Sequence, residues 1–189
     1  MRLDRPRIAP LEDADWPEEA AELKERFASS GPGGDRMLNI FRTLGYHPDL
    51  LRRWLVFGNH VLMKSTLPPR EREILILRIG WRCQAEYEWG QHVAISRELG
   101  MTDEDFARIV AGPNADGWDP FEAALVRTVD ELHTDAMVSD TTWAALAERY
   151  DTRQMLDVLF AVGQYNMVSM VLNSTGVQLD EGIPGFTGP

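Results

Sequence analysis

The stretch LPPREREILILRIGWRC, residues 67–83, decides between a helical fold and a mixed one. The mostly apolar run from Ile74 to Ile79 suits a buried strand as well as a buried helix. The two prolines that open the stretch, with acidic residues just after them, are instead typical of the first turn of a helix. Proline lacks only a donor that is unpaired there, and acidic side chains face the positive end of the helix dipole. We therefore predict a buried helix.

The segments that follow are also predicted to be helical. Residues 85–100, AEYEWGQHVAISRELG, end at Gly100, and glycine is typical just after a helix C-terminus. Thr102 is a good N-cap for the next helix, which has acidic residues in its first turn. Little of the chain alternates between polar and apolar residues with the period of a strand. The sequence predicts an all-α domain of about seven or eight helices.

The chain divides into three parts along its length. Residues 1–35 are predicted to be an arm followed by a short helix, residues 36–178 the helical domain, and residues 179–189 an irregular tail. Within the first part SSGPGGD, residues 29–35, is the clearest linker because glycine, proline and serine dominate it.

Composition narrows the class of protein. A length of 189 residues suits one domain with its own core. The net charge of −11 argues against binding nucleic acid or an anionic membrane. The N-terminus does not look like a signal peptide, and no continuous apolar stretch of about 18 residues is present. The single cysteine rules out an internal disulfide. We expect a cytoplasmic protein with no membrane span.

The stretch CQAEYEWGQH, residues 83–92, concentrates the residues that carry chemistry. A metal site is the first interpretation, because Glu88 and His92 lie four positions apart, on one helix face. Di-metal helical bundles use Glu-x-x-His, a spacing of three, on two helices, and this sequence has no second copy. We expect neither a metal nor another cofactor.

A thiol site is the second interpretation, with Cys83 as its candidate. Dithiol chemistry needs a second cysteine, which this chain lacks. Cys83 and His92 are nine positions apart, which is about half a turn out of phase on one helix. If the helix extends back that far, Cys83 points away from Glu88 and His92. A small, buried, apolar role is favoured, and a reactive thiol stays the alternative.

An acid/base site is the third interpretation. Glu73 stands in an apolar helix, so its carboxylate is either exposed at the helix edge or buried with a raised pKa. If residues 67–100 form a helical hairpin that turns at 82–85, Glu73 can face Glu88 and His92. Two carboxylates and an imidazole in a dry pocket can shuttle a proton near neutral pH. The alternative is an ordinary solvated helix face.

Aromatic and polar side chains near this motif, or in other apolar helices, are candidates for substrate contact: Tyr87, Trp89, His60, Tyr165 and Asn166. Tyr87 and Trp89 flank Glu88, and core or subunit-interface packing explains them equally well. Tyr165 and Asn166 belong with Gln164 to the polar run at 163–167. Such residues also commonly satisfy buried backbone groups.

From Met37 to Gly176 the chain resembles the carboxymuconolactone decarboxylase / alkylhydroperoxidase D-like (AhpD-like) family. The resemblance is carried by residues 67–110, LPPREREILILRIGWRCQAEYEWGQHVAISRELGMTDEDFARIV. An apolar helix bearing a glutamate comes first, then YEWxxH, then a helix ended by glycine and an acidic helix start. The resemblance implies a single-domain AhpD-like helical bundle.

The resemblance also implies the site residues. The hydroperoxidase branch carries Cys-x-x-Cys-x-x-x-His, with a relay glutamate one helix earlier. Here the two cysteine positions fall on Ala85 and Glu88, while the glutamate and histidine fall on Glu73 and His92. The redox pair is therefore missing and the acid/base residues remain. His92 is expected to be the donor or general acid, Glu88 its partner or the proton carrier, and Glu73 the residue that tunes both.

The function implied by the decarboxylase branch is a cofactor-independent carbon–carbon lyase, or an isomerase, in aromatic-compound catabolism. The substrate would be a small carbonyl- or lactone-bearing acid. The alternatives are a thiol-dependent, peroxidase-like redox or stress protein that uses Cys83, and a non-catalytic family member. Because relatives form symmetric oligomers, we expect a homo-oligomer (dimer, trimer or hexamer) whose 1–35 arm touches a neighbour.

Overall fold

A computed structural model describes residues 2–28 and 36–186, and over these residues the protein is helical, as predicted. The helices are η1 (Glu18–Ala20), α1 (Ala21–Phe27), α2 (Asn39–Leu44), α3 (Pro48–Met63), α4 (Pro69–Arg82), α5 (Glu86–Glu98), α6 (Asp103–Ala111), α7 (Pro120–Asp135), α8 (Asp140–Ala147) and α9 (Thr152–Thr175). These nine α-helices exceed the predicted seven or eight, and two of them are the short helices α1 and α2. The predicted linker at 29–35 lies outside the described residues.

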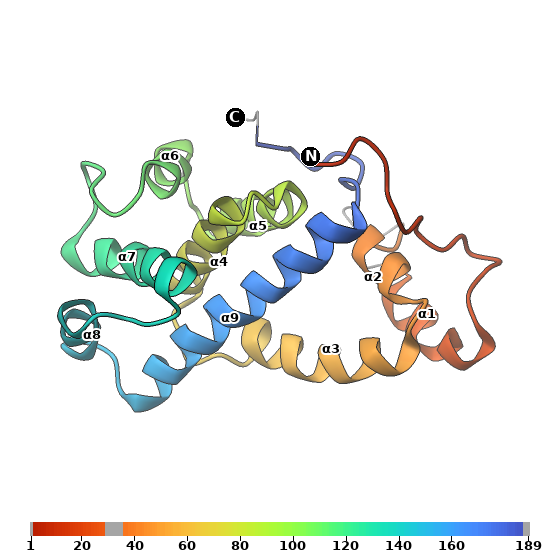
Figure 1. The fold of residues 1–189 in the computed structure, drawn as a ribbon, viewed down its shortest axis with the longest axis horizontal. Helices are drawn as coiled ribbons and strands as arrows, with labels where there is room; N and C mark the ends of the chain where they lie inside the picture. Colours follow the sequence, from red (N-terminus) through yellow and green to blue (C-terminus); the bar gives the residue numbers. More distant parts are fainter. Residues whose placement is uncertain (1, 29–35, 187–189) are drawn as a thin grey trace.

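Helix α4 is the centre of the fold, and it resolves the ambiguity of the opening stretch. It packs against α5, α7 and α9, which surround it on several sides. The side chains from Ile74 to Leu77 are fully buried, so the run is apolar on every face of a helix. Figure 1 shows α9 crossing beside α4, with α6, α7 and α8 on one side of this pair and α1 and α2 on the other.

A tight turn joins α4 to α5, as predicted. The N–H of Ala85 donates to the carbonyl of Gly80 and closes α4, and Gln84 takes the left-handed conformation, with φ of 52°. Helix α5 then begins at Glu86 and runs back along α4. This hairpin places one face of α5 against the N-terminal half of α4.

Side-chain caps set several helix boundaries. Thr102 and Asp105 form the reciprocal capping box of α6, and Asp151 and Gln154 form that of α9. At its other end α9 stops where Gly176 turns left-handed, with φ of 74°.

Helix α9 is the longest helix of the described residues. It has 24 residues, and its most apolar window has a mean hydropathy of 1.4, so by length and composition it is able to cross a membrane. Polar residues such as Gln164 interrupt its apolar residues, so the helix contains no continuous apolar run of about 18 residues. Half of that window is buried against other helices of the protein, which is the behaviour of a core helix.

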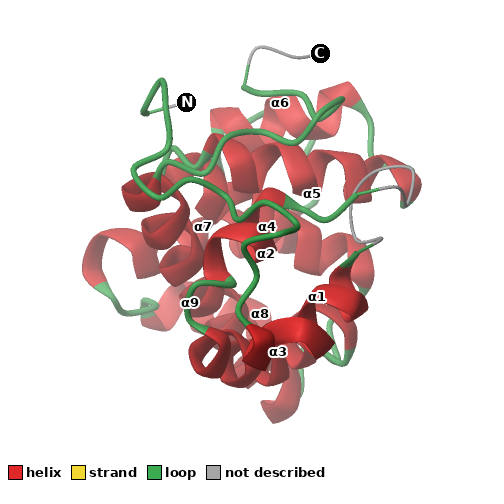
Figure 2. Ribbon diagram, turned by 90° about the vertical axis from the view of Figure 1, so that its right-hand side faces the viewer, coloured by secondary structure: helices red, strands yellow, loops and turns green. Residues whose placement is uncertain are grey.

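The two ends of the described chain lie together. Arg7 donates its backbone N–H to the carbonyl of Thr175, and the side chain of Gln178 donates to the carbonyl of Leu3. The N-terminal arm is thus laid across its own chain, with Leu11 buried. Figure 2 shows these loops on one side of the helical body.

Candidate active site

The α4–α5 hairpin brings Glu73, Glu88 and His92 into contact. The Nδ1 atom of His92 lies 2.6 Å from Oε2 of Glu73, and its Nε2 atom lies 3.0 Å from Oε1 of Glu88. The exposed fractions are 0% for Glu73, 4% for Glu88 and 5% for His92. The spacing of four on α5 puts Glu88 and His92 on one face, and Glu73 meets that face from α4. The imidazole is therefore held by a carboxylate at each nitrogen.

Arg72 extends this arrangement on the far side of Glu73. Its Nη2 and Nε atoms donate to Oε1 of Glu73 over 3.2 and 3.3 Å. Arg72, Glu73, His92 and Glu88 thus form a line of alternating charge, which we call the charge row. With a protonated imidazole the row has no net charge, and each buried group has a bonded partner of opposite sign.

The charge row keeps His92 protonated. Burial alone lowers the pKa of this imidazole, but Glu73 and then Glu88 outweigh burial and raise it to about 10. At neutral pH both ring nitrogens therefore carry hydrogen and donate to the carboxylates. Because both nitrogens are occupied, His92 offers no lone pair to a metal. The described residues contain no cluster of His, Cys, Asp and Glu able to hold one.

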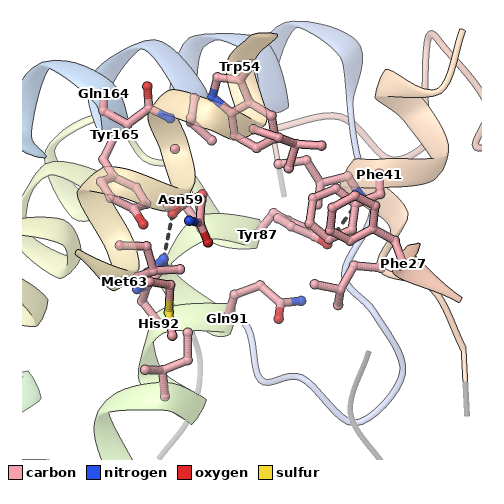
Figure 3. A pocket seen from close by; sticks show the side chains of 18 of the residues that line it. Phe27, Phe41, Trp54, Asn59, Met63, Tyr87, Gln91, His92, Gln164 and Tyr165 are labelled. Atoms are coloured by element: carbon pink, nitrogen blue, oxygen red, sulfur yellow. Dashed lines mark hydrogen bonds and ion pairs between the residues drawn. The ribbon is translucent and has the colours of Figure 1, made fainter. Parts of the chain in front are cut away.

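A cavity of about 270 Å³ opens beside the charge row. Glu88 and His92 lie in its wall, whereas Glu73 lies behind His92 and does not reach it. Most of the remaining wall is apolar or aromatic, with Phe27 from α1, Trp54 from α3 and Phe41 from α2. In Figure 3 His92 and Gln91 enter from α5, Gln164 and Tyr165 from α9, and Phe27 and Phe41 form the far end.

Tyr165 is the aromatic residue in contact with the charge row. Its ring meets that of His92 edge-on, with the ring centroids 5.0 Å apart. Burial, followed by the nearby charges of Glu88 and Glu73, holds the pKa of its hydroxyl well above the usual value. The phenol thus keeps its proton and can donate it in a hydrogen bond to a ligand.

Tyr87 also lines the cavity, but its hydroxyl already has partners. It donates to Oδ2 of Asp180 over 2.5 Å and accepts from the backbone N–H of Ile40 over 3.3 Å. A phenol has a single proton to give, so Tyr87 has none left for a ligand. Only its ring is therefore available to the cavity.

Three other predicted contacts lie outside the cavity. Trp89 is on another face of α5, where it packs against Trp81 and Phe106. His60 is exposed on α3, where its Nε2 atom lies 4.0 Å from Oδ1 of Asp157. Asn166 accepts a hydrogen bond from Cys83. Adjacent positions on a helix point in different directions, so the neighbouring residues, such as Tyr165 beside Asn166, line the cavity instead.

Cys83 points away from the charge row, but helix phase is not the reason. It is the C-cap of α4, whereas His92 lies on α5, which begins only at Glu86. Its Sγ atom lies 3.0 Å from Oδ1 of Asn166 and 3.9 Å from Nδ1 of His133. Burial raises the pKa of the thiol. The sulfur is therefore a neutral, enclosed donor outside the cavity.

Several residues of the site were missed by sequence reasoning. Arg72 had a usable signal, because a carboxylate inside an apolar helix needs a countercharge and Arg72 is its neighbour. Asn59 and Gln91 line the cavity from exposed and half-buried positions that no motif marks. Asp180 comes from the irregular tail, more than 85 residues after Tyr87 along the chain.

Comparisons with known proteins agree with this fold. A family model described as the carboxymuconolactone decarboxylase family matches residues 48–131. The solved structure described as an alkylhydroperoxidase AhpD core, an uncharacterized peroxidase-related protein from Ralstonia eutropha, is similar with a TM-score of 0.78 at 18% identity. That match covers 92% of this chain and 93% of the other. A search of curated proteins gave no match.

Two further solved structures have the same fold. A peroxidase-related protein from a Silicibacter species matches with a TM-score of 0.77 at 17% identity, over 96% of this chain and 93% of the other. The debrominase Bmp8, in complex with 2,3,4-tribromopyrrole, matches with a TM-score of 0.76 at 14% identity. That match covers 92% of this chain and 91% of the other. Residues 48–131 therefore match the carboxymuconolactone decarboxylase family model, in a chain that has the AhpD-like fold and no Cys-x-x-Cys pair.

Proposed function

We propose that this protein is an enzyme that moves a proton at a carbon next to a carbonyl group. The reaction class is cofactor-independent decarboxylation, another carbon–carbon cleavage, or isomerisation. The substrate is a small carbonyl- or lactone-bearing acid. The observation that carries the proposal is the buried charge row, which ends in Glu88 at the wall of an apolar cavity.

Glu88 is the proton carrier in this proposal. In isomerisation its carboxylate takes a proton from the carbon beside the carbonyl, the electron pair moves into an enolate, and Glu88 returns the proton to another carbon. In decarboxylation the bond to the carboxyl group breaks, CO2 leaves, and the electron pair again forms an enolate. Protonated Glu88 then delivers its proton to carbon.

His92 supplies Glu88 with that proton. It is protonated at neutral pH and donates from Nε2 to Oε1 of Glu88. In decarboxylation, proton transfer along this 3.0 Å contact reloads Glu88 after it has given its proton to carbon, and a proton from solvent water then restores the imidazolium. In isomerisation Glu88 takes its proton from the substrate, so no reloading is needed. Glu73 holds the opposite nitrogen and fixes the orientation of the ring. Arg72 balances the charge of Glu73.

Tyr165 stabilises the enolate oxygen. Enolate formation needs a hydrogen-bond donor aimed at the oxygen where negative charge develops, in a site that excludes water. The phenol of Tyr165 stays protonated and lies beside the imidazole in the same wall as Glu88. A carbonyl group that points toward Tyr165 thus has its neighbouring carbon near Glu88.

Two features support a small aromatic or conjugated acid as substrate. The cavity is small for a ligand site and has several aromatic walls, which suit a single substituted ring. Arg26 also lines it and supplies a cation for a carboxylate. Aromatic-compound catabolism and a cytoplasmic location fit this substrate and a single unpaired cysteine.

The thiol-dependent alternative has less support. It requires Cys83 to meet a substrate, yet its sulfur contacts Asn166 and His133 outside the cavity. The raised pKa of the thiol also lowers the fraction of reactive thiolate.

Proton exchange at carbon tests the proposal across a whole class of candidate substrates. A panel of cyclic ketones, β-keto acids and carboxylated lactones is incubated with the protein in D2O, and NMR follows deuterium entering beside the carbonyl and any release of CO2. Glu88→Gln should slow exchange by about 10² or more, the usual scale for a lost acid/base group. Glu98→Gln, an exposed change on the same helix, is the matched control. Equal rates in both variants, or no exchange above buffer across the panel, would reject the proposal.

A further inference from the structure

The C-terminal segment, residues 177–186, carries a buried carboxylate that the proposed chemistry does not use. Asp180 is only 5% exposed. Its Oδ2 atom accepts from the hydroxyl of Tyr87 over 2.5 Å and from Nε2 of Gln91 over 2.8 Å. Its Oδ1 atom accepts from the backbone N–H of Asn39 over 3.0 Å. One carboxylate thus joins the C-terminal segment to α5 and to α2.

Two of the three connections end at residues of the cavity wall, and the third, to Asn39, ends beside one. Tyr87 and Gln91 line it from α5, and Ile40 lines it from the first turn of α2. Leu38, at the N-cap of α2, makes no capping hydrogen bond with its side chain. Asp180 and the hydroxyl of Tyr87 instead accept from the N–H groups of Asn39 and Ile40. The acceptors that α2 needs are supplied from outside the helix.

The C-terminal segment is seated directly on the backbone of α5. A Cβ atom at Gly90 would lie 2.3 Å from the carbonyl oxygen of Pro184, so no larger residue fits there without movement. Further along, the backbone N–H of Phe186 donates to Glu86 over 3.1 Å, and its ring packs against Trp81. Gly90 lies between Glu88 and His92 in the sequence, so the segment supports the same turn of α5 that carries the site.

We propose that Asp180 is a positioning residue, through which the C-terminal segment holds Tyr87, Gln91 and α2 in place as one wall of the substrate cavity. Tyr87 acts in this wall as a support, because its proton is committed to Asp180. Without Asp180 the phenol and the amide lose a shared acceptor, and the first turn of α2 loses a cap. The inference rests on the proposed function only in taking this cavity as the substrate site.

Asparagine is the informative replacement at position 180. Its side chain has nearly the shape of aspartate, but one of its two outer atoms is a donor. On one side that donor meets Tyr87 and Gln91, and on the other it meets the N–H of Asn39. Either orientation breaks part of the network and leaves the fold of the segment otherwise unchanged.

Binding of 2-naphthol, an uncharged fluorescent ring compound, tests the proposal at equilibrium. The downfield imidazole N–H signals of His92 in NMR report whether the probe occupies the cavity. Asp180→Asn should weaken binding about tenfold, a free-energy change on the scale of one lost hydrogen bond. Tyr87→Phe should also weaken it, and the loss in the double variant should be smaller than the sum of the two single losses, because both changes act through the same network. Asp157→Asn, the same change at a carboxylate that accepts from the backbone N–H of Thr66 outside the cavity, is the control and should leave affinity unchanged.

Gly90→Ala gives a second test from the opposite side of the segment. Alanine normally favours a helix over glycine, so a local effect would leave binding intact or improve it. If the alanine side chain displaces Pro184, and Asp180 with it, the probe should instead bind more weakly, as in Asp180→Asn. Unchanged affinity in both variants, fully additive losses in the Asp180→Asn/Tyr87→Phe pair, or no probe signal at His92 in the natural protein would overturn the proposal. Deuterium exchange tests the proposed function, and probe binding tests the role of Asp180. Either proposal can therefore fail without the other.

Discussion

At the scale of single residues, Glu73 is the strictest test of the proton chemistry. It is fully buried in α4, does not touch the cavity, and meets the reacting groups only through His92. A role in catalysis must therefore pass through the imidazole. A purely structural role would leave the pH dependence of the reaction unchanged.

We predict that Glu73→Gln slows deuterium exchange by about 10² or more and shifts or removes one limb of the pH–rate profile. Glutamine keeps the shape of the side chain but does not hold the imidazole in its charged form. Glu71→Gln is a matched control on the same helix, because Glu71 is buried and bonded to Arg149 and Tyr150. Glu71→Gln should lower the free energy of unfolding and leave the pH–rate profile unchanged. A profile unchanged in height and shape for Glu73→Gln contradicts the prediction.

His92 also makes stability depend on pH. Its pKa is about 10 in the folded protein and 6.5 ordinarily. A group whose pKa is raised by folding contributes its full stabilisation at pH values below its pKa in the unfolded chain. It loses that stabilisation as pH rises through its pKa in the folded protein. The free energy of unfolding in urea should therefore fall between pH 6.5 and pH 10, and fall less steeply in His92→Gln. Equal slopes in the two proteins would show that the imidazole is not paired as described.

The geometry of the site was predictable from the sequence to the extent that it depends on helix phase. The spacing of Glu88 and His92, with a hairpin turn after Arg82, suffices to bring Glu73 alongside. On α3 the polar character of His60 in an otherwise apolar helix makes it a candidate, whereas its neighbour Asn59 lines the cavity. Helix α9 is apolar on most faces, and no pattern there separates Tyr165 from Asn166.

At the scale of elements, the contact between Asp180 and α5 illustrates what local patterns do not contain. The composition of the tail predicts irregular structure, which is correct for residues 177–186, yet it does not indicate that the segment packs on α5. The helices were predictable because prolines, caps and glycines mark their ends locally. The place where a loop packs depends on its tertiary contacts. Here it depends on Gly90, whose lack of a side chain leaves room for Pro184.

The α4–α5 turn sets the register of the hairpin, and Gln84 is its strained position, with φ of 52°. Gln84→Val should destabilise the protein by about 1–3 kcal/mol, because a β-branched residue avoids the left-handed region. Gln84→Gly, which adopts this conformation freely, should keep or raise stability. Urea unfolding measures both variants. Similar stability for the two would mean that the turn relaxes to another conformation.

At the scale of the whole molecule, α3 and α9 each expose several large apolar side chains. The exposed fractions are 76% for Val56, 71% for Met63, 56% for Phe160 and 58% for Met170. Phe57 of α3 and Phe160 of α9 meet edge-on across the two helices, with the ring centroids 5.9 Å apart. Exposed apolar patches that span two elements commonly mark protein interfaces. We call this surface the α3/α9 patch.

We predict that a second copy of the chain covers the α3/α9 patch in a closed homo-oligomer, because a symmetric interface pairs one patch with the same patch on a neighbour. Light scattering at micromolar concentration should give a mass of at least a dimer. Phe160→Asp puts a charge among the apolar side chains, where burial without a partner is costly, and should reduce the mass to that of a monomer. Trp143→Asp, which changes an exposed aromatic residue on α8, is the control and should not alter the mass. A natural protein that is monomeric, or a Phe160→Asp variant that remains oligomeric, would show that this surface is not the interface.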